Sequence, residues 1–341
     1  MSRVAAQRQR TLRSYLTLDA YQKPWTLDDL HCAYMRLNML AESTQQRYDL
    51  VVRNLSRHLC GDTAHPSDIG LNKITVDAAL SFREWSLKRM RPTSFNSERR
   101  HLSALFNFAI RQKRMDANPF HDVTGAPVMR LLPKSLPLQD MRRYIEVLAT
   151  GVTTDRWGRS VDLFPPQWFW LATIKTFYYT GMRKRQLIGL VWQDIDFFSK
   201  TIRLRAQTSK TRREWLIPLP TALIGDLQLL RARTTEIRGH GMGEQQVFCL
   251  PLFSTWKENF VKRQMSGDNL DNFFQRLRKQ MPADMPRLSA HRIRHTTATI
   301  LANSVPNLKV VQEQLGHSSI TTTYGYVHAD MAAMRKAVET L

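Results

Sequence analysis

Residues 288–304 read LSAHRIRHTTATILANS, and this stretch carries the most informative pattern in the chain. Ser289 is a favoured N-cap residue, so the stretch predicts a helix that begins just after it. On that helix His291, Arg294 and His295 share one face, while Ile293 and other apolar side chains point toward a core. Histidines and arginines gathered on one face need an anion or an acid as partner. A surface helix with scattered basic residues is the alternative for this stretch alone.

A second stretch, LGHSSITTTYGYVH at residues 315–328, follows the first closely. It contains two tyrosines, Tyr324 and Tyr326, between His317 and His328. The spacing alone leaves open which tyrosine, if either, does chemistry. On a helix, two residues of offset turn the two side chains in different directions.

Two further stretches lie upstream. TGMRKRQLIGLVWQDID at residues 180–196 follows the apolar run from Trp168 to Tyr179, which predicts a buried helix that ends at Gly181. SKTRREWLIPL at residues 209–219 overlaps the second of two β-prone runs, TIRLRAQ and EWLIPL, which are joined by TSKTRR. These runs predict a hairpin with a basic tip.

The four stretches together resemble the tyrosine recombinase/phage integrase family. Its signatures are an arginine after Thr-Gly-x, a hairpin lysine before Pro-Leu, a His-x-x-Arg-His box, and Leu-Gly-His followed nine residues later by tyrosine. The matching residues here are Arg183, Lys210 before Pro218, HRIRH from 291, and His317 with Tyr326. The resemblance covers residues 135–328 through motifs and residues 26–120 more loosely.

The resemblance implies that Arg183 and Arg294 clamp the nonbridging oxygens of one DNA phosphate. Guanidinium forks stay charged and bind phosphate bidentately, so they suit the charge that builds in the transition state. Tyr326 is expected to attack in line, giving a 3′-phosphotyrosyl bond and a free 5′-hydroxyl. Tyr326 is preferred over Tyr324, which is expected to be a packing residue or a contact at a helix start.

The remaining site residues follow from the same resemblance. Lys210 is expected to protonate the departing 5′-oxygen, His291 to assist as general acid or base, and His317 to bond the phosphate. His295 is expected beside the site as a supporting contact. Gln186 departs from the family, which often has Glu or Asp three residues after the arginine, so neutral hydrogen bonds are expected to support Arg183. No cofactor and no metal are expected, because nothing resembles a phosphate-binding glycine loop or an acidic cluster for Mg²⁺.

The N-terminal half predicts three amphipathic helices, at residues 43–59, 75–90 and 94–114. Their polar faces are dense in basic residues, as suits contacts along the phosphates of a duplex, although any single one is more often a solvated side chain. With basic residues of the catalytic half, the predicted DNA-binding residues are Lys88, Arg89, Arg91, Arg99, Arg100, Arg111, Arg212, Arg213 and Arg292.

The predicted fold is mainly α with a small β-sheet or hairpin (α+β). A helical core-binding, SAM-like domain and a catalytic domain are expected to form a C-shaped clamp around DNA. The expected parts are a basic N-terminal arm at 1–25, the helical domain at 26–120, a Pro-containing linker at 121–137, and the catalytic domain at 138–341. A tail helix at 329–341 has an apolar stripe, and the resemblance implies that it packs into a neighbouring protomer.

The composition limits the class of protein. Lys and Arg number 50 against 29 Asp and Glu, a formal net charge of +21, which favours a polyanionic partner over a merely basic soluble enzyme. The 3 cysteines form no CxxC pair, so neither a disulfide framework nor a zinc site is indicated. No membrane segment is predicted, and a cytoplasmic, nucleoid-associated protein encoded by a bacterium, phage or mobile element is expected.

The predicted function is site-specific DNA recombination, independent of metal and ATP, through a Holliday junction. The expected partners are double-stranded recombination sites, three further protomers in a homotetramer on DNA, and possible accessory proteins. The free chain is expected to be a monomer or a weak oligomer. Two alternatives stay open: a type IB topoisomerase-like enzyme that relaxes DNA, and a DNA-binding protein without catalytic activity.

Overall fold

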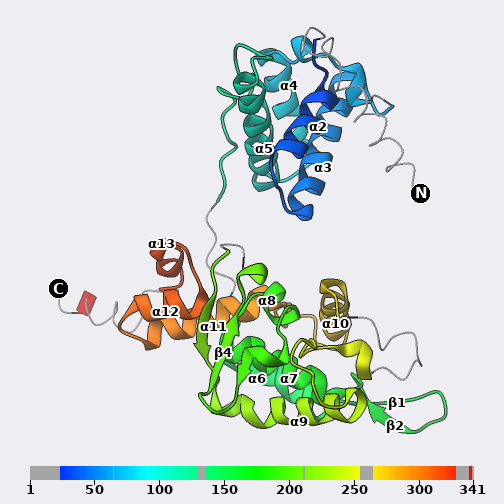
Figure 1. Ribbon diagram of the computed structural model, residues 1–341, viewed down its shortest axis with the longest axis vertical. Helices are drawn as coiled ribbons and strands as arrows, with labels where there is room; N and C mark the ends of the chain where they lie inside the picture. Colours follow the sequence, from blue (N-terminus) through cyan, green and yellow to red (C-terminus); the bar gives the residue numbers. More distant parts are fainter. Residues whose placement is uncertain are drawn as a thin grey trace. The chain divides into compact units, whose positions relative to one another are not determined.

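The computed structural model describes residues 24–63, 65–129, 135–209, 212–253, 264–327 and 338–339. The chain divides into two compact units, Met1–Leu131 and Leu132–Leu341, and each has its own hydrophobic core. The described residues are mostly helical with two small antiparallel sheets, which confirms the predicted fold class (Figure 1). Most of the predicted N-terminal arm (residues 1–23) and of the predicted tail helix (all but 338–339) lies outside the described residues.

The described part of the first unit contains four α-helices. Their amphipathic patterns place large apolar side chains, among them Phe82, Phe95 and Phe106, fully inside one core. Three of the helices were predicted, and the fourth, which precedes them, was not; its capping box joins Thr26 to Asp29. The helices are α2 (Leu27–Leu37), α3 (Glu42–Cys60), α4 (Val76–Leu87) and α5 (Pro92–Arg111).

The extended segment after α5 packs on this unit. Val123 and Ala126 are buried in its core cluster. The side-chain amide of Asn96 donates to the Ala126 carbonyl (2.8 Å) and accepts from the Ala126 N–H (2.7 Å). The helical unit therefore extends through residues 121–126, which the sequence predicts as linker.

The second unit combines eight α-helices with five short strands among its described residues. Strands β1 and β2 pair as a hairpin, while β3, β4 and β5 form a three-stranded sheet in which Ile202 faces Ile217. The helices are α6 (Leu138–Thr150), α7 (Gln167–Thr180), α8 (Lys184–Ile188), α9 (Thr221–Arg238), α10 (Gly267–Lys279), α11 (Ala290–Ser304), α12 (Leu308–Leu315) and α13 (Ile320–Tyr324). The strands are β1 (Val152–Thr154), β2 (Ser160–Asp162), β3 (Ile195–Asp196), β4 (Thr201–Leu204) and β5 (Trp215–Pro218).

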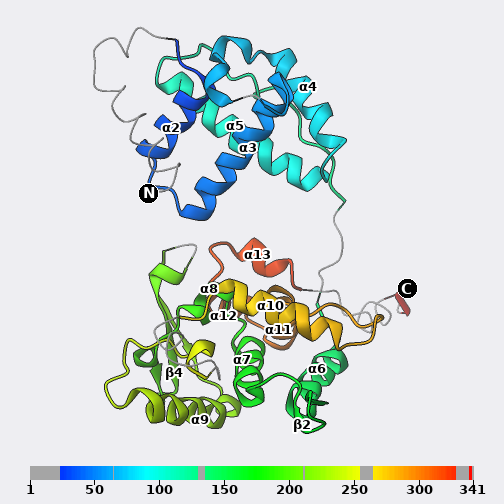
Figure 2. The ribbon, with the colours of Figure 1, turned by 90° about the vertical axis from the view of Figure 1, so that its right-hand side faces the viewer.

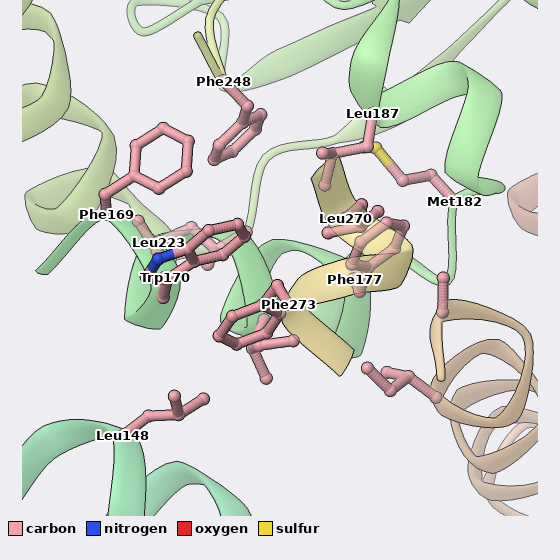
Figure 3. Close-up of a cluster of buried hydrophobic side chains, with 14 of the residues drawn as sticks. Leu148, Phe169, Trp170, Phe177, Met182, Leu187, Leu223, Phe248, Leu270 and Phe273 are labelled. Atoms are coloured by element: carbon pink, nitrogen blue, oxygen red, sulfur yellow. The ribbon is translucent and has the colours of Figure 1, made fainter. Parts of the chain in front are cut away.

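Helix α7 is the centre of the second core, as its apolar sequence predicts. The Trp170 ring stacks on Phe273 of α10 with ring centroids 3.8 Å apart, and Phe169 and Phe177 lie in the same cluster (Figure 3). The buried threonines of α7 each donate a hydroxyl hydrogen bond to the carbonyl four residues earlier, as Thr173 does to Phe169. The polar residues of a buried helix are thus satisfied within the helix.

The elements that carry the sequence motifs pack on one another. Helices α11, α12 and α13 lie side by side, and α11 also packs on α7 (Figures 1 and 2). The predicted hairpin is confirmed as β4 and β5. Within the described ranges, no helix is long and apolar enough to cross a membrane.

Candidate active site

Arg294 lies at the centre of the candidate site. Ser289 caps α11 by accepting from the Arg292 N–H (3.3 Å), and the helix then carries Arg294 into the interior, where its side chain is 4 % exposed. Its Nη1 donates to the Gly181 carbonyl (2.7 Å) and its Nη2 to the Leu315 carbonyl (2.8 Å). Two backbone segments far apart in the sequence therefore hold one guanidinium.

Gly181 makes this contact geometrically feasible. It ends α7 in the left-handed region, with φ of 64°, where a residue with a Cβ is strained. An added Cβ would also lie 2.8 Å from the Leu315 side chain and 3.3 Å from that of Thr297. The glycine thus lets the turn before Arg183 approach α11 and α12 closely.

Arg183 begins the next helix, α8. Its backbone N–H donates to the Gln186 side-chain oxygen (2.7 Å), and its Nη1 and Nη2 lie 3.4 and 3.5 Å from the Gly316 carbonyl. Gln186 is 1 % exposed, and its Nε2 has no hydrogen-bond partner among the described residues. Gln186 therefore supports Arg183 through a neutral hydrogen bond to the backbone.

The two arginines form an unneutralised pair of cations. Burial and the proximity of Arg183 lower the pKa of Arg294, and burial lowers the pKa of Arg183. Neither forms an ion pair with a carboxylate in the part of the chain that the structure describes. Because buried charges are costly without a counter-charge, the pair is suited to bind an anion.

Tyr326 lies beside this pair. Its side chain is 7 % exposed, and its ring contacts the rings of His317 and His295, with centroids 5.7 and 5.1 Å apart. The phenol is close enough to both arginines to interact with their charges. Tyr324, at the end of α13, is 60 % exposed, so it is neither a core packing residue nor at the start of a helix.

His317 is fixed by a residue that the motifs do not include. Its Nδ1 lies 3.0 Å from the Thr323 hydroxyl, and Thr323 is fully buried. Burial, together with Arg294 and Arg183, lowers the pKa of His317 to about 4, so the imidazole is neutral at pH 7. The only sequence signal for Thr323 is its place one helical turn before Tyr326.

His291 and His295 form a pair on α11. Their Nε2 atoms are 2.7 Å apart, and their rings meet edge to face. Burial and the neighbouring cations lower the pKa of His295 to about 4 and also lower that of His291. His291 is exposed, whereas His295 is half-buried, with Nδ1 fully covered.

Lys210 lies outside the described residues, but the strand that follows it packs on the site. An added Cβ at Gly316 would lie 2.2 Å from the Trp215 indole, so only glycine fits beneath this ring. Arg212 and Arg213 are exposed at the same end of the hairpin. Beside it lies a cavity of about 320 Å³, lined by Arg213, Trp215, Leu216, Glu313, Gly316, His317 and Ser318.

The other predicted DNA-binding residues differ in how freely their side chains could contact DNA. Arg99 is half-buried and donates to the Val123 carbonyl (2.9 Å), and Arg292 donates to the Arg287 carbonyl (2.9 Å). Arg89 stacks over the ring of Trp85 at 4.3 Å. The exposed members on α4 and α5, or just beside these helices, are Lys88, Arg89, Arg91, Arg100 and Arg111.

One group of possible metal ligands occurs among the described residues, and it belongs to the first unit. Donor atoms of Asp28, His31 and Cys32 lie within 4.8 Å of one another. The His31 Nε2 is already 3.0 Å from an Asp49 carboxylate oxygen. The candidate site in the second unit is built from cations, imidazoles and a phenol instead.

Two sequence profiles match the chain. The phage integrase SAM-like domain matches residues 29–125, and the phage integrase family matches residues 166–333. These ranges lie in the first and second unit respectively.

Curated proteins named as tyrosine recombinases are 25% to 28% identical to this chain. A putative tyrosine recombinase XerC of Pseudomonas syringae is 28% identical over 332 residues, which cover 93% of this chain and 64% of the relative. The tyrosine recombinase XerC of Vibrio parahaemolyticus is 25% identical over 88% of this chain and 87% of the relative. This chain thus spans a little under two thirds of the P. syringae relative.

Solved structures have the same fold. The Tn1549 transposon integrase in complex with a circular intermediate DNA aligns with a TM-score of 0.66 at 21% identity, covering 93% of this chain and 99% of that one. A lambda integrase tetramer bound to a Holliday junction aligns with a TM-score of 0.64 at 18% identity, covering 92% and 81%. Because the two profile matches together take in most of both units, the chain belongs to the phage integrase family of tyrosine recombinases.

Proposed function

We propose that the protein is a site-specific tyrosine recombinase, which cleaves and rejoins DNA through a 3′-phosphotyrosyl intermediate and a Holliday junction. The observation that carries the proposal is the buried guanidinium of Arg294 and the half-buried one of Arg183, which lie beside the Tyr326 phenol without a carboxylate partner among the described residues. A DNA phosphodiester would supply the missing negative charge. The relatives named as tyrosine recombinases support the same function.

In the proposed cleavage step, the guanidiniums donate to the two nonbridging oxygens of one phosphate. The Tyr326 oxygen forms a bond to phosphorus while the bond from phosphorus to the 5′-oxygen breaks. Charge grows on the nonbridging oxygens in the transition state, so donors that are already in place lower the barrier. The leaving 5′-oxygen takes a proton from Lys210, and the reverse sequence rejoins the strand without ATP.

The histidines have separate proposed roles. The Thr323 hydroxyl engages Nδ1 of His317, which leaves Nε2 of the neutral ring to donate to a phosphate oxygen. His291 is proposed to assist as general acid or base. His295 and Gln186 are proposed to support the site from behind, Gln186 by holding the Arg183 backbone.

The exposed basic residues are proposed to bind the flanking duplex. Lys88, Arg89, Arg91, Arg100 and Arg111 would contact phosphates from the first unit, and Arg212 and Arg213 from the second. Arg292, which is half-buried and bonds the Arg287 carbonyl, is proposed as a further phosphate contact of the second unit. Arg99, which already bonds the backbone at Val123, would serve first to hold that segment. Each contact supplies affinity and register, whereas base contacts set the target sequence.

We propose further that four protomers assemble on two DNA sites and that the two units close on DNA as a C-shaped clamp. The tail at residues 329–341 would pack into a neighbouring protomer. The lambda integrase tetramer on a Holliday junction supports this assembly by similarity of fold. The reaction would take place in the cytoplasm at the nucleoid, with accessory proteins where the site requires them.

A suicide substrate, nicked so that the cleaved strand is lost by diffusion, tests the function. We expect a covalent protein–DNA adduct with the unaltered chain, none with Tyr326→Phe, and an undiminished amount with the matched control Tyr324→Phe. Absence of any adduct would leave a DNA-binding protein without catalytic activity. Relaxation of supercoiled DNA without recombinant products from paired sites would favour the topoisomerase alternative.

A further inference from the structure

The two histidines of α11 differ in their contacts with Tyr326. The Tyr326 ring contacts the rings of His295 and His317, whereas the His291 ring contacts the ring of His295. His291 and His295 are joined through their Nε2 atoms, 2.7 Å apart. His295 therefore lies between the tyrosine and the histidine that the family motif assigns to acid or base chemistry.

The short Nε2 to Nε2 distance restricts the protons of this pair. One Nε2 must carry a hydrogen and the other must accept it, because two N–H groups would repel and two lone pairs would not bond. Burial and the neighbouring arginines keep both rings neutral at pH 7 by lowering their pKa values. Each ring then carries one hydrogen only.

The second nitrogen of His295 decides which arrangement is favoured. Its Nδ1 is fully covered and has no hydrogen-bond partner among the described residues. An N–H at this position would be a buried, unsatisfied donor, which costs about 1–3 kcal/mol. The favoured arrangement has the hydrogen on Nε2 of His295, donated to His291, and a lone pair on Nδ1.

His317, the other ring in contact with Tyr326, is less suited to accept a proton. Its Nδ1 is engaged by the Thr323 hydroxyl (3.0 Å). Its Nε2 is the nitrogen proposed to donate to the phosphate, so in that arrangement neither nitrogen offers a lone pair to the phenol.

We propose that His295 is the proton acceptor for the Tyr326 phenol and that it relays the proton to His291. This inference deepens the proposed function and rests on it. As the phenolic oxygen bonds to phosphorus, its proton moves to Nδ1 of His295, while the hydrogen on Nε2 of His295 moves to Nε2 of His291. His295 ends neutral, and the added positive charge is on His291, the exposed member of the pair.

The relay solves an electrostatic difficulty of this site. If His295 kept the proton, the added positive charge would lie on a half-buried ring beside Arg294 and Arg292. His291 also lies within reach of the Arg294 and Arg183 charges, but its side chain is exposed. Transfer to the solvent-exposed His291 moves that charge to where water can stabilise it. In the rejoining step the same chain returns the proton to the tyrosine oxygen, so no proton is gained or lost over the cycle.

The test measures single-turnover adduct formation on the suicide substrate by the full chain. His295→Phe keeps a ring of similar size but removes both nitrogens, and we expect the cleavage rate to fall about 10²- to 10⁴-fold at pH 7. Replacing Tyr326 by a fluorinated tyrosine with a more acidic phenol should recover at least about tenfold of that loss. Thermal unfolding of each variant establishes that it is folded, and His295→Asn serves as a second variant if the phenylalanine variant is not.

A matched control separates the two ends of the reaction. A substrate with a 5′-bridging sulfur has a better leaving group, and it should rescue Lys210→Ala but not His295→Phe. The fluorinated tyrosine should instead rescue His295→Phe but not Lys210→Ala. Cleavage by folded His295→Phe at the normal rate, or its rescue by the sulfur substrate alone, would overturn the relay, whereas failure of the unaltered chain to form an adduct would overturn the proposed function instead.

Discussion

At the scale of single residues, the geometry of Arg294 explains why a guanidinium is needed at that position. Its two Nη atoms already donate to the carbonyls of Gly181 and Leu315, and each still carries a second hydrogen. The side chain thus joins three segments and can still donate to a ligand. A lysine has one nitrogen and cannot reproduce this fork.

We therefore predict that Arg294→Lys keeps DNA binding but lowers the rate of adduct formation about 10²- to 10³-fold, as loss of a preorganised oxyanion donor does. Single-turnover cleavage at saturating DNA measures the rate, and a filter-binding titration measures affinity. Arg278→Lys is the matched control, because the Arg278 guanidinium also donates to backbone carbonyls, those of Pro282 and Ala283, and is not part of the site. Equal rates for the two variants would contradict the clamp.

The neutral histidines give the DNA-free protein a pH-dependent stability. The pKa of both His295 and His317 is lowered to about 4 from the usual 6.5, so between these values the unfolded chain binds more protons than the folded one. The contribution of these two histidines to the free energy of unfolding should be complete above about pH 6.5 and should be lost as the pH drops toward 4. Urea unfolding at several pH values measures this, and His317→Gln should flatten the slope if the assignment holds.

At the scale of elements, the sequence predicts the long helices well because their periodicity is regular. The Ser289 cap, the apolar run of α7 and the hairpin of β4 and β5 each have a local signal. Helices α8 and α13 do not, since each has only five residues and depends on tertiary contacts for its stability.

The site required contacts that no local pattern encodes. The motifs name Arg183, Arg294 and Tyr326, but the carbonyls that hold the two arginines come from Gly181, Leu315 and Gly316. Backbone acceptors have no sequence signature. The pairing of His295 with His291 follows from helical spacing, whereas its contact with Tyr326 depends on how α13 packs on α11.

The packing of Trp215 on Gly316 leads to a prediction about the β4 and β5 hairpin. Gly316→Ala would place a Cβ 2.2 Å from the indole at a position with φ of 63°, so the hairpin must move away. We expect a loss of about 1 kcal/mol or more in the free energy of unfolding, together with slower cleavage as the Lys210 hairpin shifts. Denaturant unfolding and the suicide substrate measure the two effects.

A matched glycine isolates the steric part of this effect. Gly239 also has a positive φ, 76°, but an added Cβ there would meet nothing within 4 Å. Gly239→Ala should therefore cost only the backbone strain and leave cleavage unchanged. The double variant Gly316→Ala with Trp215→Leu should recover part of the cleavage rate, and a lack of recovery would count against the indole contact.

At the scale of the whole molecule, two cores share one chain. The first is built around Phe82, Phe95 and Phe106, and the second around Phe169, Trp170 and Phe177, and none of these side chains is more than 2 % exposed. Separate cores allow each unit to unfold by itself. DNA contacts proposed for both units would couple them when DNA is bound.

We predict that calorimetry of the DNA-free chain resolves two unfolding transitions. Phe106→Ala should lower the midpoint temperature of the first unit only, and Phe177→Ala that of the second unit only. Each substitution removes a fully buried ring, at a cost of about 3–5 kcal/mol to the stability of its own unit. Addition of a DNA duplex that carries the recombination site should raise both transitions, because a ligand stabilises every unit that contributes to its binding. A single transition lowered equally by both substitutions would show instead that the units unfold as one, and DNA stabilisation confined to one transition would restrict the DNA contacts to that unit.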